Sequence, residues 1–276
     1  MIRFFCSSKE YKKSNIIFIG LPYDETSSFL KGSRFAPQDV RDVSESIESY
    51  SPYLDKDLED IEFFDDGDVG EGILDASKFL EVAETRVVKY LKDNKKVFCF
   101  GGEHLVSLAP IKQYAKKYED LYIIHFDAHA DLRDTYDGEK LSHATVLRRV
   151  CEVVEPSKIY QFGIRSGTRE EYRFARENTN FFPTNLDNFA RNIEPLKDKP
   201  IYITLDLDIL DPSIFTGTGT PEPGGVSFNE LLSAIKILSK YNIVGVDVVE
   251  LSPEHDYSKV SSIVGAKIIR ELLLIL

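Results

Sequence analysis

Short apolar runs alternate along this chain with longer segments of helical periodicity. The runs are rich in Ile, Val, Phe and Tyr, and they predict eight strands at residues 15–20, 61–65, 96–101, 121–127, 158–163, 180–184, 200–206 and 243–250. Apolar positions three and four residues apart, with charges opposite them, predict helices that include residues 77–91, 168–176, 227–239 and 260–274. Strands that alternate with helices predict one largely parallel sheet covered by helices on both faces, an α/β fold.

The length and the composition favour one soluble domain. The chain has 276 residues, of which 42% are apolar, so it can bury a sizeable core, and we find no repeat, low-complexity tract or linker. A single domain over residues 1–276 is expected. There is no run of eighteen apolar residues and no signal-peptide pattern, which predicts a cytoplasmic protein without a membrane anchor. Cys6, Cys99 and Cys151 form no CxxC motif and are expected to be reduced thiols.

The charge narrows the class of partner. The formal net charge is −12, and a nucleic-acid surface would need a basic stripe that the chain lacks. An acidic protein is compatible with a small cationic ligand. Net charge also serves solubility alone, so the charge excludes a class of partner without identifying one.

Acids and histidines follow four of the predicted strands. They are Glu103 and His104 after 96–101; His125, Asp127, His129 and Asp131 in HFDAHADL; Asp206 and Asp208 in YITLDLD; and Asp247 and Glu250 in IVGVDVVE. Ligands of parallel sheets bind outside the carboxyl ends of the strands. Alternate side chains of a strand point to the same side, so we expect these groups to converge at one edge of the sheet.

Each motif has a plainer explanation when it is taken alone. GGEH also fits a glycine turn followed by a helix cap, LDLDILDP also fits an Asp-rich turn, and DAHAD also fits a solvated loop. A metal site explains all of these motifs together, because bound cations would neutralise the charges of the clustered carboxylates.

Two divalent cations would balance the four negative charges of the aspartates at these strand ends, which are Asp127, Asp131, Asp206 and Asp208. Neutral His104 and His129 would complete the coordination. An oxygen-rich set with two imidazoles and no thiolate suits Mn²⁺ better than a structural zinc ion. Two ions about 3.5–4 Å apart can share a water and lower its pKa.

Seven segments carry a resemblance to a known family: PYDETSSFLKGSRFAPQDVR, GGEH, HFDAHADLRD, LSHATVLRRV, GIRSGTREEY, ITLDLDILDPSIFTGTGTPEPGG and DVVELSPEHD. In content and order they resemble the ureohydrolases of the arginase superfamily, most closely its agmatinase family, over most of the chain. The resemblance implies a three-layer α/β/α domain with two Mn²⁺ ions per subunit. It implies that one ion is held by His104, Asp127, Asp131 and Asp206, and the other by Asp127, His129, Asp206 and Asp208.

The resemblance also implies catalytic roles. His143 in LSHAT matches the proton-shuttling histidine of the family, although a histidine at a helix start is its plainer explanation. Glu250 in VVELSP matches the carboxylate that receives the substrate guanidinium. Asp131 is counted with these two as a catalytic residue. His125 matches no ligand position and is expected to support the site, and His255 is expected at the surface.

The reaction implied is attack of a metal-bridging hydroxide on a guanidinium carbon, with release of urea and an amine. Agmatine is the expected substrate, and putrescine and urea the products, because Asp134, Asp137 and Glu139 would make an acidic pocket rim that suits a terminal ammonium. These acids also fit a solvated loop. Alternatives are guanidinobutyrase, arginase or formimidoylglutamase activity, more distantly an amide deacetylase, or a catalytically silent binding relative.

Three further features complete the expectations. Ala130 and Ala144 stand where relatives often carry Thr and Gly, which bears on substrate fit and removes no ligand. The glycine-rich segment 216–225 is expected to be a backbone turn. The family commonly forms trimers or hexamers, so a homo-oligomer is expected.

Overall fold

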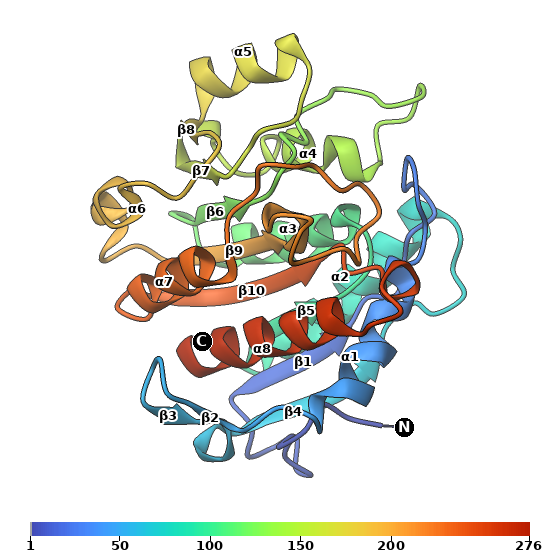
Figure 1. The fold of residues 1–276 in the computed structure, drawn as a ribbon, viewed down its shortest axis with the longest axis vertical. Coiled ribbons are helices and arrows are strands. Elements are labelled where there is room, and N and C mark those ends of the chain that lie inside the picture. The colour runs from blue at the N-terminus through green and yellow to red at the C-terminus, as the bar shows by residue number, and fades with distance from the viewer. Residues whose placement is uncertain (1) are drawn as a thin grey trace.

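The computed structural model describes residues 2–276, and its centre is one parallel sheet (Figure 1). All eight predicted strands are present. They are β1 (Ile16–Gly20), β4 (Phe63–Asp68), β5 (Lys96–Phe100), β6 (Tyr122–Phe126), β7 (Ile159–Phe162), β8 (Asn180–Phe182), β9 (Ile201–Asp206) and β10 (Ile243–Val249). All neighbouring strands of this sheet pair in parallel. A two-stranded antiparallel ribbon, β2 (Tyr50–Ser51) with β3 (Lys56–Asp57), lies outside the sheet.

Helices cover both faces of the sheet (Figure 1). They are α1 (Ala36–Ser44), α2 (Ala76–Lys92), α3 (Leu108–Lys117), α4 (Val146–Val150), α5 (Arg169–Asn178), α6 (Phe189–Asn192), α7 (Phe228–Leu238) and α8 (Val260–Ile275). The four helices predicted by residue range are confirmed to within two residues at each end. Two of the four begin at capping boxes, which Thr168 forms with Glu171 at α5 and Ser227 forms with Glu230 at α7. The expected three-layer α/β/α fold is therefore confirmed.

Two apolar cores lie on opposite faces of the sheet, because successive strand residues point to opposite sides. Phe18 and Phe98 pack in the core that includes residues of α1, α7 and α8. Ile17 and Val97 pack in the core that includes residues of α2 and α3. Both faces are buried, which is why the central strands are mostly apolar. Within residues 2–276, no helix combines the length and the apolar character that crossing a membrane requires.

The order of the strands explains where the polar motifs meet. The order across the sheet is β4-β1-β5-β10-β9-β6-β7-β8. The four strands that precede the acids and histidines, β5, β10, β9 and β6, are neighbours at the centre of the sheet. Their carboxyl ends share one edge, so the loops after them lie side by side and build one site, as the sequence predicts.

Candidate metal centre

The segment HFDAHADL reaches the site by a loop, whereas alternation along a strand was expected. Strand β6 ends at Phe126, so only His125 of the four ionisable residues lies in it. Asp127 Oδ1 accepts a hydrogen bond from the backbone N–H of His129 at 2.6 Å, which folds the loop back on itself. Asp131 has a φ of 53°, a left-handed conformation that Asp tolerates better than most residues. The residues converge, but a turn brings them together.

A first group of ligand atoms surrounds His104, at the start of the turn after β5. Its Nδ1 lies 2.9 Å from Asp127 Oδ2, 3.2 Å from Asp131 Oδ2 and 3.4 Å from Asp206 Oδ2. All four side chains are buried. These are the four residues that the family resemblance groups around one ion.

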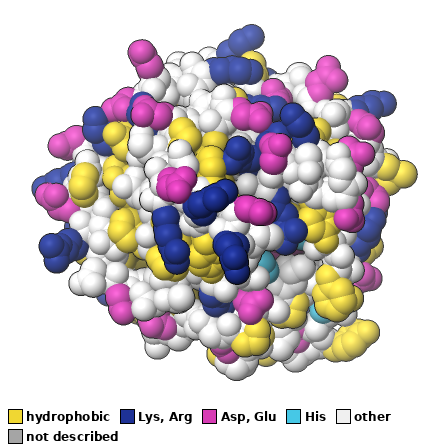
Figure 2. Space-filling view, turned by 90° about the horizontal axis from the view of Figure 1, so that it is seen from above, with side chains coloured by type: hydrophobic (Ala, Val, Ile, Leu, Met, Phe, Trp, Pro, Cys, Tyr) yellow, Lys and Arg dark blue, Asp and Glu magenta, His cyan; other side chains and the backbone are white. Residues whose placement is uncertain are grey.

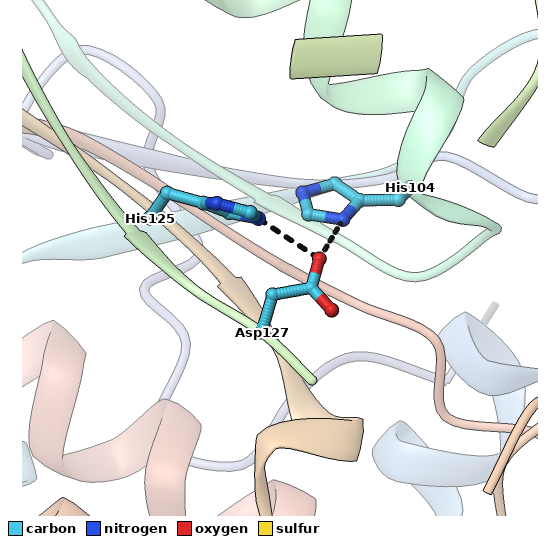
Figure 3. Close-up of side chains that lie close together, drawn as sticks. All are labelled: His104, His125 and Asp127. Carbon is cyan, nitrogen blue, oxygen red and sulfur yellow. Dashed lines mark hydrogen bonds and ion pairs between the residues drawn. The ribbon is translucent and has the colours of Figure 1, made fainter. Parts of the chain in front are cut away.

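A second group lies around His129 and shares Asp127 with the first. His129 Nδ1 is 2.9 Å from Asp208 Oδ2 and 3.5 Å from Asp127 Oδ1. Asp208 lies in a 3-10 turn after β9, whose start is capped by the Asp206 carboxylate, which accepts from the Asp208 N–H at 2.8 Å. Asp206 and Asp208 therefore meet through a turn as well. His125 is also close, since its Nε2 lies 2.8 Å from Asp127 Oδ2 (Figure 3).

The electrostatics of these groups favour bound cations. Burial raises the pKa of Asp206 well above its ordinary value, and the charges of Asp208 and Asp127 raise it further. Burial lowers the pKa of His104, but its contacts with Asp127, Asp131 and Asp206 outweigh burial and raise the pKa well above the ordinary value. The protein alone must therefore hold protons in the cluster to limit repulsion among its carboxylates.

The hydrogen bonds behind His104 show that the residues fit a metal ion. Thr204 Oγ1 donates to Asp247 Oδ1 at 2.7 Å, so it accepts from His104 Nε2 at 2.9 Å. In the neutral ring the proton is then on Nε2, and the lone pair of Nδ1 points at three carboxylates. Within residues 2–276, His104 Nδ1 and Asp208 Oδ2 are buried atoms that no hydrogen bond satisfies. Divalent cations would satisfy both atoms, and carboxylates with imidazoles suit Mn²⁺.

His143 and Glu250 lie beside the cluster. His143 Nδ1 is 3.6 Å from Glu250 Oε1, and the same oxygen accepts from the His104 N–H at 2.8 Å. The backbone N–H of Ser28 donates to His143 Nε2 at 3.1 Å, so in the neutral ring the proton is on Nδ1, toward Glu250. Glu250 has a φ of 65°, which is unusual for Glu and marks a backbone that the surrounding structure holds in place.

Glu103 also lies at this site, as its place after β5 predicted, and the alternative of a helix cap is not what its side chain does. Its carboxylate is fully buried and accepts from the Thr26 N–H at 3.2 Å, from the Thr26 hydroxyl and from Ser27 Oγ at 2.9 Å. The Thr26 hydroxyl in turn accepts from the His143 N–H at 3.2 Å. Burial raises the pKa of Glu103 to about 7. Glu103 thus anchors the loop that contacts His143.

A pocket of about 250 Å³ opens onto the cluster. Its lining includes His129, Asp131, Asp206 and His143, so two expected ligands of each ion and the proposed proton shuttle face it. Figure 2 views the molecule from the end where α5 lies, and there Lys and Arg side chains gather near a visible histidine. A net charge of −12 therefore does not make this face uniformly acidic.

The expected acidic pocket rim is wrong. Of the charged residues in 133–142, Arg133 alone lines the pocket. Asp134 instead pairs with Arg149 at 2.6 Å, and Asp137 and Glu139 are exposed in a tight hairpin. The hairpin places the Tyr136 ring edge-on to His143, with centroids 6.4 Å apart, and Arg133 lies over that ring. The acids of this loop therefore solvate it, and an aromatic and a basic side chain reach the pocket.

Sequence reasoning missed several residues that hold the site together. Thr204 and Gln161 are polar residues inside fully buried strands, and that placement was the available signal. Arg165, in the quoted motif GIRSG, donates to the carbonyl oxygens of Asp208 at 2.8 Å and Glu222 at 2.7 Å, and so ties two loops together. The carbonyl groups that accept from Arg165 come together only in the folded loops, so the sequence does not reveal them.

Comparison with known proteins identifies the family of the chain. The model of the arginase family matches residues 14–275. An agmatinase of Bacillus cereus is 44% identical over 98% of this chain and 95% of its own. A crystal structure of a Clostridium difficile protein is 46% identical and superposes with a TM-score of 0.94, over 96% of this chain and 98% of the other.

The same fold also occurs with another activity. The proclavaminate amidinohydrolase of Streptomyces clavuligerus is 28% identical, covers 100% of this chain and 97% of its own, and superposes with a TM-score of 0.90. The fold alone thus leaves the substrate open. The family is settled by the full-length match and by the agmatinase relatives. The chain belongs to the arginase family and is a ureohydrolase, a hydrolase of amidine C–N bonds.

Proposed function

We propose that the chain is a binuclear manganese agmatinase, which hydrolyses agmatine to putrescine and urea. The observation that carries the metal part is the buried His104 Nδ1, which faces three carboxylates and has no hydrogen-bond partner among residues 2–276. The substrate part is supported by relatives named agmatinase that are 43–44% identical over 98% of the chain.

Each of the two ions would have four protein ligands. His104, Asp127, Asp131 and Asp206 would hold one, and Asp127, His129, Asp206 and Asp208 would hold the other. When bound, manganese ions of such a pair lower the pKa of a shared water and stabilise negative charge that develops on the substrate. The four aspartates supply four negative charges, and two divalent cations balance them.

The other residues of the site bind the substrate and move protons. One Glu250 oxygen already accepts from the His104 N–H, which leaves the second oxygen and the remaining lone pairs for the N–H groups of a guanidinium. Charged hydrogen bonds would orient the guanidinium carbon toward the metal cluster. His143 lines the pocket and is close to Glu250, so it can deliver a proton to the nitrogen of the leaving amine.

A second candidate, hydrolysis of a guanidino acid, is favoured by one observation. Arg133 at the pocket would attract a substrate that ends in a carboxylate and repel one that ends in an ammonium. The pocket also contains Glu171, whose carboxylate lies 3.5 Å from Arg133 Nε and offsets that charge. We favour agmatine because of the relatives' names and because Glu171 gives an ammonium a partner.

A comparison of kcat/KM for agmatine, 4-guanidinobutyrate and arginine tests the substrate. We expect agmatine to be preferred, with urea as a product for every substrate that turns over. A preference for 4-guanidinobutyrate would show that the substrate is a guanidino acid and not agmatine. The assignment as a hydrolase would still stand. Assembly as a trimer or hexamer and a cytoplasmic location stay predictions.

A further inference from the structure

Two buried polar side chains lie behind the shared aspartate of the metal cluster. His125 of β6 and Gln161 of β7 are directly opposite each other in the sheet, and neither is exposed to solvent. We propose that Gln161 and His125 form a relay that fixes the direction of the Asp127 carboxylate and so strengthens metal binding. The inference rests on the proposed manganese function and deepens it. It assigns positioning roles to two residues that the proposed ligand sets leave out, although His125 lies close enough to His104 and Asp127 to be a candidate ligand by distance alone.

The orientation of the Gln161 amide follows from its neighbours. Its Nε2 lies 3.1 Å from the carbonyl oxygen of Ala130, which can only accept a hydrogen bond. Its Oε1 lies 3.0 Å from the hydroxyl of Thr179, which can donate. The reverse orientation would place two acceptor oxygens against each other at Ala130. The amide nitrogen therefore faces Ala130 and His125.

The orientation of Gln161 sets the tautomer of His125. The second hydrogen of Gln161 Nε2 is donated to His125 Nδ1 at 3.2 Å, so Nδ1 is an acceptor. The proton of the neutral ring is then on Nε2, which donates to Asp127 Oδ2 at 2.8 Å (Figure 3). Every donor in the relay meets an acceptor, and the relay ends on the carboxylate that both ions would share.

Each carboxylate oxygen of Asp127 accepts a hydrogen bond from a different donor, and the relay supplies one of the two. Asp127 Oδ1 accepts from the His129 N–H at 2.6 Å, while Oδ2 accepts from His125. One donor on each oxygen fixes the plane of the carboxylate, and the same two oxygens, Oδ2 and Oδ1, lie 2.9 Å from His104 Nδ1 and 3.5 Å from His129 Nδ1, respectively. Partners of this kind, which orient a metal ligand from behind, change metal affinity by about 10- to 100-fold when they are removed.

Simple packing is the competing explanation, and two variants separate it from the relay. Gln161→Met removes the donor to His125 at nearly constant volume. Thr179→Val removes a contact on the far side of the same amide and leaves both Nε2 hydrogens with their acceptors. Calorimetric titration of the metal-free full chain with MnCl₂ gives the affinities, and denaturant unfolding in chelator reports stability apart from metal.

We expect Gln161→Met to bind Mn²⁺ about 10- to 100-fold more weakly and Thr179→Val to bind within about twofold of the wild type. Unchanged affinity in folded Gln161→Met, or an equal loss in both variants, would overturn the relay. A wild-type chain that binds no Mn²⁺ would instead refute the proposed function. These two failures are therefore distinguishable.

The tautomer gives a test that needs no core substitution. In ¹⁵N-histidine-labelled wild-type protein loaded with diamagnetic Mg²⁺, long-range ¹⁵N–¹H spectra report which nitrogen of each of the five histidines carries the proton. The relay requires His125 to be protonated at Nε2 and bare at Nδ1. Protonation at Nδ1 would contradict the relay. Because the spectrum is recorded on the wild-type protein, this test holds even if Gln161→Met fails to fold.

Discussion

Thr204→Val tests how far metal binding depends on the support of His104. Thr204 is fully buried, and its hydroxyl accepts from His104 Nε2 at 2.9 Å and donates to Asp247 Oδ1 at 2.7 Å. Valine has nearly the same shape, so the variant removes the hydroxyl and creates no large cavity. His104 then loses its acceptor, and its ring is free to take either tautomer.

The magnitude follows from the groups left without partners. A buried polar group that loses its hydrogen bond costs about 1–3 kcal/mol. His104 Nε2 loses its acceptor, whereas Asp247 Oδ1 keeps the Ser107 hydroxyl at 2.8 Å and loses one of two donors. We expect the free energy of unfolding of the chelated protein to fall by about 2–4 kcal/mol and the Mn²⁺ affinity to fall by about 10- to 100-fold.

Ser107→Ala is the matched control, because it removes the other donor to Asp247 and leaves the hydrogen bond to His104 in place. Denaturant unfolding in chelator gives the stability of each variant, and calorimetry gives its Mn²⁺ affinity. We expect the control to lose stability and to keep its affinity. Equal affinities of Thr204→Val and Ser107→Ala would refute the role of Thr204 in orienting His104.

Three further predictions follow from the site. His143→Ala should keep its manganese but lose about 10²- to 10⁴-fold in kcat, and a kcat within threefold of the wild type would remove His143 from proton transfer. The raised pKa values of His104 and His129 mean that the folded, metal-free chain holds protons above pH about 6.5 that the unfolded chain releases. Its unfolding free energy should therefore fall as the pH rises above about 6.5, while Mn²⁺ affinity rises over the same range. Unfolding in chelator at several pH values checks this, and a rise in stability over this range would contradict it. Arg133→Ala should raise kcat/KM for agmatine and lower it for 4-guanidinobutyrate, each by about fivefold for a charge interaction of about 1 kcal/mol, and steady-state kinetics that show no opposite change would place Arg133 outside substrate selection.

The sequence predicted the fold and the convergence of the site well, because both depend on patterns that are local in the chain. Apolar runs located all eight strands, and acids and histidines after four of them pointed to a shared edge. The adjacency of β5, β10, β9 and β6 needed the fold, since strand order depends on which distant segments pair. Spacing alone suggested no role for His143 or Glu250, and the roles proposed for them come from the family resemblance.

The predictions that were wrong concern side chains whose direction depends on the conformation of a loop. The residues after Phe126 and Asp206 were read as strand alternation, but turns capped by Asp127 and Asp206 bring them together. The acids of residues 133–142 were expected at the pocket, but Arg149 engages Asp134 and the hairpin directs the others to solvent. The turns are closed by hydrogen bonds between residues two apart, which alternation of side chains does not take into account, and Arg149 lies 15 residues from Asp134, so the composition of the loop does not identify it.

The most direct measurement of the central claim combines metal content with product formation. The wild-type chain, purified and reconstituted with Mn²⁺, is assayed for bound manganese by elemental analysis and for urea released from agmatine, beside Asp127→Asn, which weakens the ligand that both ions would share. The account predicts about two Mn²⁺ per wild-type chain, urea in a one-to-one ratio with putrescine, and the loss of both metal and turnover in the variant. Wild-type turnover without bound metal, or an Asp127→Asn variant that keeps two ions and near-normal activity, would contradict it.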